Sequence, residues 1–408
     1  MSTNSSVNGP VIEGEGPKRY AKTPHLWALG VGAVISGDFF GWQAALVAGF
    51  DGLLILLAVV TVQYVLLSFS IAELSATVPH GGGPYVFALH GIGKTAAFFA
   101  GIAECLKVVV TTGVAATGIG SYFAEIIGVS SDFGPIWWIA CYLIFVTLNV
   151  MGVEMTFRVQ AAATAMSTTK NMPRGLVTSI ITLIAISFCT VIFNSMISPG
   201  ADEMYANASP LLEGYKTVFG DNSTTSGFTW ILIVGLISSF HSFVFCMGKQ
   251  AALHPTRGTT YVALITGSII ALVLVIVLHF AIGDNRLGSV LINLALIGAI
   301  VSYLFQLTAF VMLRIREPER PRPYKSPFGI PGAVVCIILC IFSLVSIIYS
   351  GTSSWVFLAS VLVAIGYFII GAVYFVYRVK PRLEVGNGPV SAKEFRENLM
   401  SSRVSNKV

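Results

Sequence analysis

Asp38 is an acidic residue in the middle of an apolar run, residues 26–47, that is long enough to cross a membrane. A carboxylate at the centre of a bilayer costs about 2.5–3.5 kcal/mol or more, so it persists where it has a partner, water or a function. Gly37 and Gly41 flank it and permit a local break in a helix, which would expose backbone groups to a ligand. We therefore predict a substrate site at these three residues and Ser36, with the carboxylate facing an ammonium group or a coupling cation. The alternative is that Asp38 only caps the second half of the helix.

Glu104 and Lys107 lie in another apolar run and are three residues apart, which places them on one face of a helix. One hypothesis is that Glu104 is a proton or cation site, held ionised by Lys107. The other is a structural pair in which the two charges neutralise each other within the membrane. Both remain open from the sequence.

Ser239 and His241 belong to a polar band within the apolar stretch 235–247. Histidine titrates near neutral pH, so His241 could relay a proton, and we assign both residues to the substrate site. The alternative is packing, because polar side chains in membrane helices often bond to their own backbone or to a neighbouring helix.

Residues 78–87 are too apolar for an ordinary solvent loop and too rich in glycine and proline for a helix. Irregular backbone at membrane depth requires protein or a water-filled cavity around it. We predict that this segment dips into the cytoplasmic mouth, with Glu73, Gly82 and Tyr85 as a gate. A plain connector is the alternative.

The composition is that of an integral membrane protein. Of the 408 residues, 55% are hydrophobic and only 11% are charged, and the mean hydropathy is +0.81. Alternation at period 2 is absent, which favours helices over a β-barrel. The sequence therefore predicts an all-α membrane protein with about ten spans of the length that a bilayer requires. The ten apolar runs are residues 26–47, 52–77, 95–123, 134–152, 174–198, 228–248, 259–282, 288–313, 331–350 and 354–377.

Basic residues predict the orientation. With the N-terminus inside, all but Lys107, Lys216 and Arg286 of the 24 lysines and arginines fall in cytoplasmic segments. The net charge of +5 is then a topology signal and does not indicate nucleic-acid binding.

The expected organisation is a cytoplasmic tail at 1–25, a transmembrane domain at 26–378 and a second cytoplasmic tail at 379–408. The plasma membrane is the expected location, with a glycosylation site at Asn222 on the largest outer loop.

The sequence gives no sign of an enzyme. It contains no nucleophile and base arrangement, and the six cysteines all lie in apolar runs without zinc-site spacing. Residues 91–95 lack the leading glycine of a phosphate-binding loop. We expect no catalytic residue, metal or cofactor, and a proton or sodium gradient as the energy source.

Several segments together resemble a known family. They are residues 34–42 (VISGDFFGW), 73–85 (ELSATVPHGGGPY) and 322–329 (RPYKSPFG), and they are similar to the amino acid/polyamine/organocation (APC) superfamily of permeases. The first of these and residues 239–242 (SFHS) most resemble the ethanolamine permease branch. The superfamily resemblance covers about residues 20–380.

This resemblance implies a five-plus-five inverted repeat followed by two further helices. The substrate would bind midway through the membrane, between broken first and sixth helices and against the third and eighth. Relatives have twelve spans, so the fifth and sixth helix region is expected to be truncated here, after Met166. We read residues 157–166 as a cytoplasmic loop or a short segment on the membrane surface.

The predicted function is secondary active transport of a small amine or amino acid through alternating access, with ethanolamine or a similar compound as the best candidate substrate. The partners would be that substrate and the lipid bilayer. The alternative is a non-transporting shortened isoform, or an incomplete gene product, that at most binds or senses a partner in the membrane.

Overall fold

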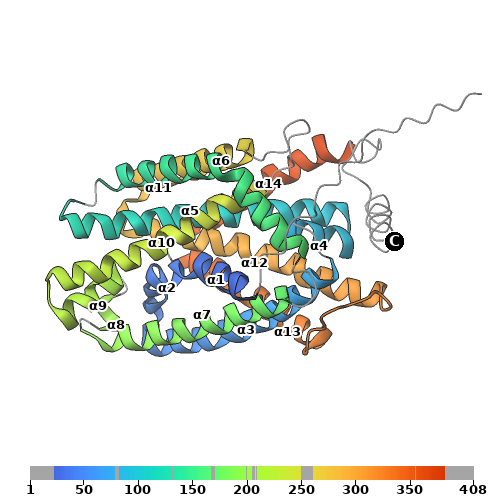
Figure 1. Cartoon of the computed structure of the whole chain (residues 1–408), viewed down its shortest axis with the longest axis horizontal. Coiled ribbons are helices and arrows are strands. Elements are labelled where there is room, and N and C mark those ends of the chain that lie inside the picture. The colour runs from blue at the N-terminus through green and yellow to red at the C-terminus, as the bar shows by residue number, and fades with distance from the viewer. Residues whose placement is uncertain are drawn as a thin grey trace, which may run out of the picture.

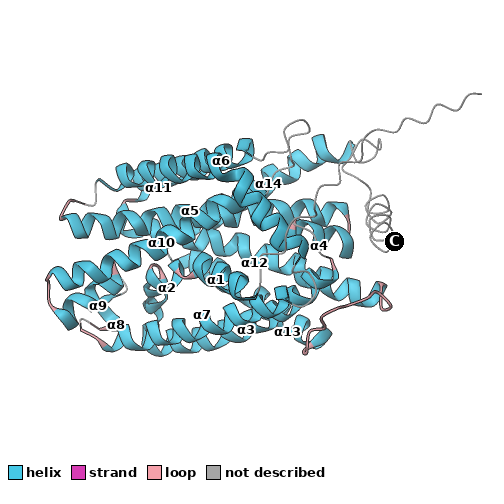
Figure 2. Ribbon diagram, in the orientation of Figure 1, coloured by secondary structure: helices cyan, strands magenta, loops and turns pink. Residues whose placement is uncertain are grey.

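The computed structural model describes residues 23–78, 82–130, 133–166, 171–198, 200–204, 207, 209–249, 261–353 and 355–381. Within these ranges all regular structure is helical (Figure 2). An all-α fold is therefore confirmed. Most of the two expected cytoplasmic tails, at 1–22 and 382–408, lies outside the described residues.

The helices follow one another in this order (Figure 1): α1 Thr23–Val34, α2 Ser36–Phe39, η1 Trp42–Ala48, α3 Gly49–Thr77, α4 Gly83–Gly91, α5 Lys94–Ile127, α6 Gly134–Met166, α7 Asn171–Met196, α8 Ala201–Met204, α9 Pro210–Phe219, α10 Ser223–Lys249, α11 Tyr261–Ile282, α12 Asp284–Arg316, α13 Gly329–Ser353, α14 Trp355–Tyr374 and the π-helix η3 Phe375–Val379.

Eight of the described helices are long and apolar enough to cross a membrane, namely α3, α5, α7, α10, α11, α12, α13 and α14 with its extension η3. Each coincides with one of the ten predicted runs. The fourth run begins α6, in which the apolar stretch Gly134–Val150 is shorter than those eight. The first run is divided among α1, α2 and η1.

Three helices form the centre of the bundle. Helix α5 packs against both α10 and α12, with α1, α3 and α7 on one side of these helices and α6 and α11 on the other (Figure 1). Small residues bring α5 and α12 together, because a Cβ added at Gly298 would lie 2.8 Å from the backbone nitrogen of Lys107. Such close approach is how membrane helices gain packing without a hydrophobic driving force between them.

The two ends of the bundle are formed by different elements. Helix α4, the start of α5 with Lys94 and the end of α12 with Arg314 and Arg316 lie at one end, the expected cytoplasmic side. Helices α8 and α9 lie at the opposite end (Figure 1). The expected sidedness itself remains a prediction.

Two local predictions are wrong. The glycine- and proline-rich segment becomes helical at Gly83, because Pro84 falls in the first turn of α4, where its missing N–H is not needed. Residues 157–166 are neither a loop nor a separate segment, since α6 continues through them to Met166. This stretch contains no glycine or proline and is rich in alanine, the strongest helix former.

Candidate functional site

The first apolar run is interrupted where the sequence predicts. Helix α1 ends at Val34, the four-residue helix α2 follows, Phe40 is extended, and Gly41 takes a left-handed conformation with φ of 105°. A Cβ at Gly41 would also lie 2.6 Å from Cδ1 of Ile292. The positive φ favours glycine at this position, and any side chain would also have to displace the end of Ile292.

Gly37 differs from the prediction that both glycines permit the break. It lies inside α2 without a positive φ, and a Cβ built on it would meet nothing within 4 Å. The break therefore depends on Gly41, whereas Gly37 leaves open space beside Asp38.

Neighbouring helices satisfy the backbone groups that the break releases. The Ser239 hydroxyl on α10 donates to the Gly32 carbonyl at 2.9 Å and accepts from the Ser36 N–H at 3.3 Å. The Tyr122 hydroxyl on α5 donates to the Phe39 carbonyl at 2.7 Å. Buried backbone groups need such partners, so these contacts hold the interruption in place.

The Gly41 N–H is satisfied from the other side of the break. It donates to Oε1 of Gln43 at 2.9 Å, and the Gln43 amide in turn donates to the Asn207 carbonyl at 3.0 Å. This chain of bonds links the end of the break to the segment between α8 and α9.

Asp38 is buried, with 8% of its surface exposed. Its Oδ1 accepts a short hydrogen bond of 2.5 Å from the Ser187 hydroxyl on α7. Among the described residues, no basic side chain forms an ion pair with it. A neutral hydroxyl orients this carboxylate without cancelling its charge, which leaves the charge for a cation.

His241 points away from this site. It follows Ser239 by two residues on α10, and its Nδ1 lies 3.0 Å from Nδ2 of Asn149 on α6. Residues two apart do not share a helix face. The structure therefore brings Ser36, Asp38 and Ser239 together and places His241 against a different helix, in agreement with the packing alternative for that histidine.

Glu104 and Lys107 form the pair that their spacing indicates. Lys107 Nζ lies 2.5 Å from Oε1 of Glu104, and Oε2 accepts from the Ser302 hydroxyl on α12 at 2.9 Å. Lys107 Nζ also lies 5.6 Å from the centroid of the Tyr303 ring. The two charges thus compensate each other at the packed interface of α5 and α12.

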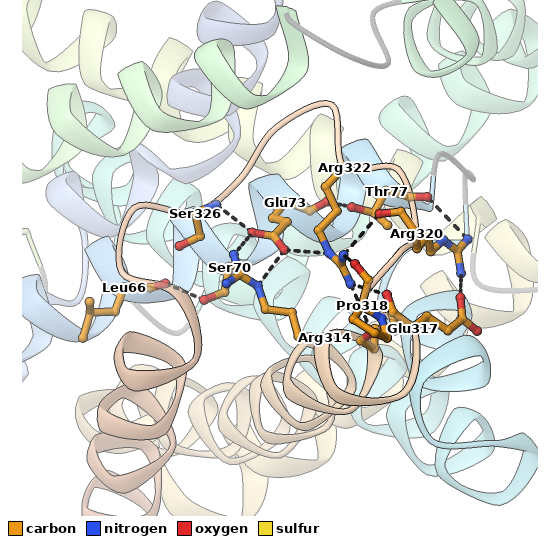
Figure 3. A network of polar contacts seen from close by, with 11 residues as sticks. Leu66, Ser70, Glu73, Thr77, Arg314, Glu317, Pro318, Arg320, Arg322 and Ser326 are labelled. Carbon is orange, nitrogen blue, oxygen red and sulfur yellow. Dashed lines mark hydrogen bonds and ion pairs between the residues drawn. The ribbon is translucent and has the colours of Figure 1, made fainter.

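Glu73 is the centre of a charged network at the expected cytoplasmic end (Figure 3). It lies near the end of α3 with a side chain only 2% exposed. Arg314 binds it with two nitrogens, at 2.9 and 2.5 Å, and Nε of Arg322 lies 3.4 Å away. The backbone N–H of Ser326 donates to it at 2.6 Å. One carboxylate therefore ties α3 to the end of α12 and to the segment 317–328.

The same arginines fix the shape of that segment. The second guanidinium nitrogen of Arg322 donates to the carbonyls of Leu313 at 3.1 Å and Glu317 at 2.7 Å. Arg320 pairs with Glu317 at 2.9 Å and reaches the Thr77 carbonyl at 3.4 Å (Figure 3). The helix ends, which carry unsatisfied carbonyls, are thus closed by cationic side chains.

The other two predicted gate residues lie at the start of α4. Gly82 immediately precedes α4. Tyr85 is half-buried in α4 and packs near Gly101 of α5, and burial raises the pKa of its hydroxyl. Tyr85 is therefore a neutral packing group in this arrangement.

Asn222, the predicted glycosylation site, is exposed and directly precedes α10. Its side-chain carbonyl accepts from the N–H groups of Thr224 at 2.9 Å and Thr225 at 3.2 Å. It is thus the N-cap of the helix.

Sequence reasoning missed the partners of the site. Ser187, Tyr122 and Gln43 fall in no motif, and only the folded chain brings them to the break. Arg314 and Arg322 carried a signal, since they belong to a dense run of basic residues that predicted the orientation, and Arg322 also begins the segment 322–329 that carries the family resemblance.

Comparison with known proteins identifies the family of this chain. The family model for amino acid permeases matches residues 23–282. An uncharacterised transporter of Rhizobium meliloti (strain 1021) is 28% identical over 153 residues, a region that covers 35% of this chain and only 32% of that relative.

Solved structures of the Eremococcus coleocola manganese transporter share the fold. A mutant form of that transporter has a TM-score of 0.51 at 12% identity, covering 90% of this chain and 96% of that one. The complex with an aromatic bis-isothiourea compound has a TM-score of 0.52 at 11% identity, covering 87% and 94%. The chain therefore belongs to the amino acid permease family, whose members are not enzymes, and it has the fold of a multi-pass membrane transporter.

Proposed function

We propose that this protein is a secondary active transporter of a small amine, with ethanolamine as the best candidate. The observation that carries the proposal is Asp38, a buried carboxylate beside a helix break whose protein partner is the neutral Ser187 hydroxyl. A cationic ammonium gains a charge-assisted hydrogen bond at such a group. Ethanolamine has no carboxylate, whereas the carboxylate of an amino acid would be repelled by Asp38.

Transport would follow an alternating-access cycle. Helix α2 and Gly41 form the broken element near which the substrate binds, as is typical of inverted-repeat transporters. The Glu73 network is the proposed gate at the cytoplasmic end, because it joins α3, α12 and the segment 317–328 by contacts that would have to separate for release.

The Glu104 and Lys107 pair is the proposed coupling site for a proton or sodium gradient. Its Lys107 ammonium and Ser302 hydroxyl both contact the carboxylate, so a proton or cation that enters would have to displace one of them. Such a change would alter the packing of α5 against α12, which approach each other closely at Gly298.

Uptake by vesicles tests the proposal. Purified protein in proteoliposomes should take up labelled ethanolamine in a saturable manner, and alanine should compete poorly. Asp38→Asn should lower uptake efficiency at least about tenfold, because a hydrogen bond to a charged group is worth about 1.5–3 kcal/mol. Asp51→Asn makes the same chemical change at an exposed acid of α3 and should leave uptake unchanged. Equal effects of the two substitutions would contradict a substrate role for Asp38.

The rival proposal is a shortened form that does not transport. It is supported by the resemblance, which implies two spans more than the ten predicted from the sequence, and by the eight described candidate spans, none of which is divided as the first apolar run is. Saturable uptake by the wild-type chain would exclude it. A transcript that encodes two further spans after Met166 would support it.

A further inference from the structure

The break in the first helix is held by one face of α10. We propose that Ser239, together with Gly235 one turn earlier, is a positioning site that keeps α2 separate from α1 and so places Asp38. The effect on substrate binding rests on the proposed function, but the effect on the position of α2 does not.

Ser239 takes the place of a missing helical bond. Gly32 and Ser36 are four residues apart, so their carbonyl and N–H would bond directly in a continuous helix. Instead, both groups bond to the Ser239 hydroxyl, which donates to the carbonyl and accepts from the N–H. A side chain inserted into the backbone ladder is a recognised cause of a kink.

Ser239 is fully buried, and its hydroxyl is already engaged by the backbone of the first apolar run. Its surface is 0% exposed, and its hydroxyl donates its single hydrogen to Gly32. A hydroxyl offers one donor, so none remains for a ligand. Ser239, which the sequence assigned to substrate binding, is therefore better explained as a residue that acts through the backbone.

Gly235 lies against Phe39, the last residue of α2. A Cβ built on it would lie 2.4 Å from Cε2 of Phe39. Gly235 and Ser239 are four residues apart and so lie on one face of α10. This face contacts the first residue of α2 through a hydrogen bond and the last through the Phe39 ring, and Tyr122 of α5 closes the far end.

Helix α2 depends on these external contacts. It has four residues, far fewer than the roughly 12–15 that an isolated helix needs in water. Its order must therefore come from its neighbours. Removing the Ser239 hydroxyl leaves the half-buried Gly32 carbonyl and Ser36 N–H without their shared partner.

Hydrogen–deuterium exchange of the full chain in detergent tests this inference. Ser239→Ala should speed exchange of the amides of residues 36–41 at least about tenfold, because the Gly32 carbonyl and the Ser36 N–H both lose a bond. Ser242→Ala is the matched control, since that hydroxyl bonds only the Ser238 carbonyl of its own helix. Ser239→Thr keeps the hydroxyl and should retain slow exchange.

A second variant covers the case in which Ser239→Ala does not fold. Tyr122→Phe removes the donor to the Phe39 carbonyl and should also speed exchange at residues 36–41. Unchanged exchange in the folded variants would overturn the inference. Ethanolamine uptake is measured in parallel: if the wild-type chain shows none, the proposed function fails while the exchange result still decides the role of Ser239.

Discussion

At the scale of single residues, Gly37 and Gly41 have different structural roles. Gly41 has a positive φ and its Cβ position lies 2.6 Å from Ile292, whereas Gly37 has neither constraint. Gly41→Ala should lower the free energy of unfolding by about 1–3 kcal/mol, the usual cost of a strained backbone position. Gly37→Ala should cause no loss, because alanine is favoured over glycine inside a helix. Thermal unfolding in detergent measures both, and an equal loss in the two variants would contradict the assignment of the break to Gly41.

At the scale of elements, the Glu73 network joins α3 to the end of α12. Glu73→Gln keeps the shape of the side chain but removes the negative charge that Arg314 and Arg322 share. Breaking a buried ion pair costs about 3–5 kcal/mol, so the midpoint of unfolding should fall clearly. Glu319→Gln changes an exposed acid in the neighbouring segment and should have no measurable effect. A Glu73→Gln protein as stable as the wild type would show that the network does not hold these elements together.

The elements also show what the sequence could predict. The eight long spans were predictable because a run of about 20 apolar residues needs no knowledge of its neighbours. Asp38 was predictable for the same reason, since its cost arises from its own position. Helix α4 was not, because it is short and its glycines and proline mask the helical signal. Ser187 and Tyr122 were not either, since they reach the break from 149 and 83 residues away.

At the scale of the whole molecule, the expected topology places Asn222 outside the cell. In a host that glycosylates, the wild-type chain should carry a glycan, seen as a mass shift that a glycosidase removes. Thr224→Ala should abolish the shift because it destroys the sequon, while the N-cap made by the Asn222 side chain is kept. A second sequon, residues 207–209, is followed by Pro210, and its Asn207 is half-buried, so Asn207→Gln should leave the shift unchanged. Absence of any shift in the wild-type chain would count against the predicted orientation.

The bond between Glu73 and Arg314 spans 241 residues, and this separation matters while the protein is being made. The ribosome delivers the acid early and its arginines only in the last quarter of the chain. Until then the nascent protein holds a carboxylate without its counter-ions at the end of a membrane helix. A polypeptide that stops before Arg314 keeps the Glu73 carboxylate without either of its arginines.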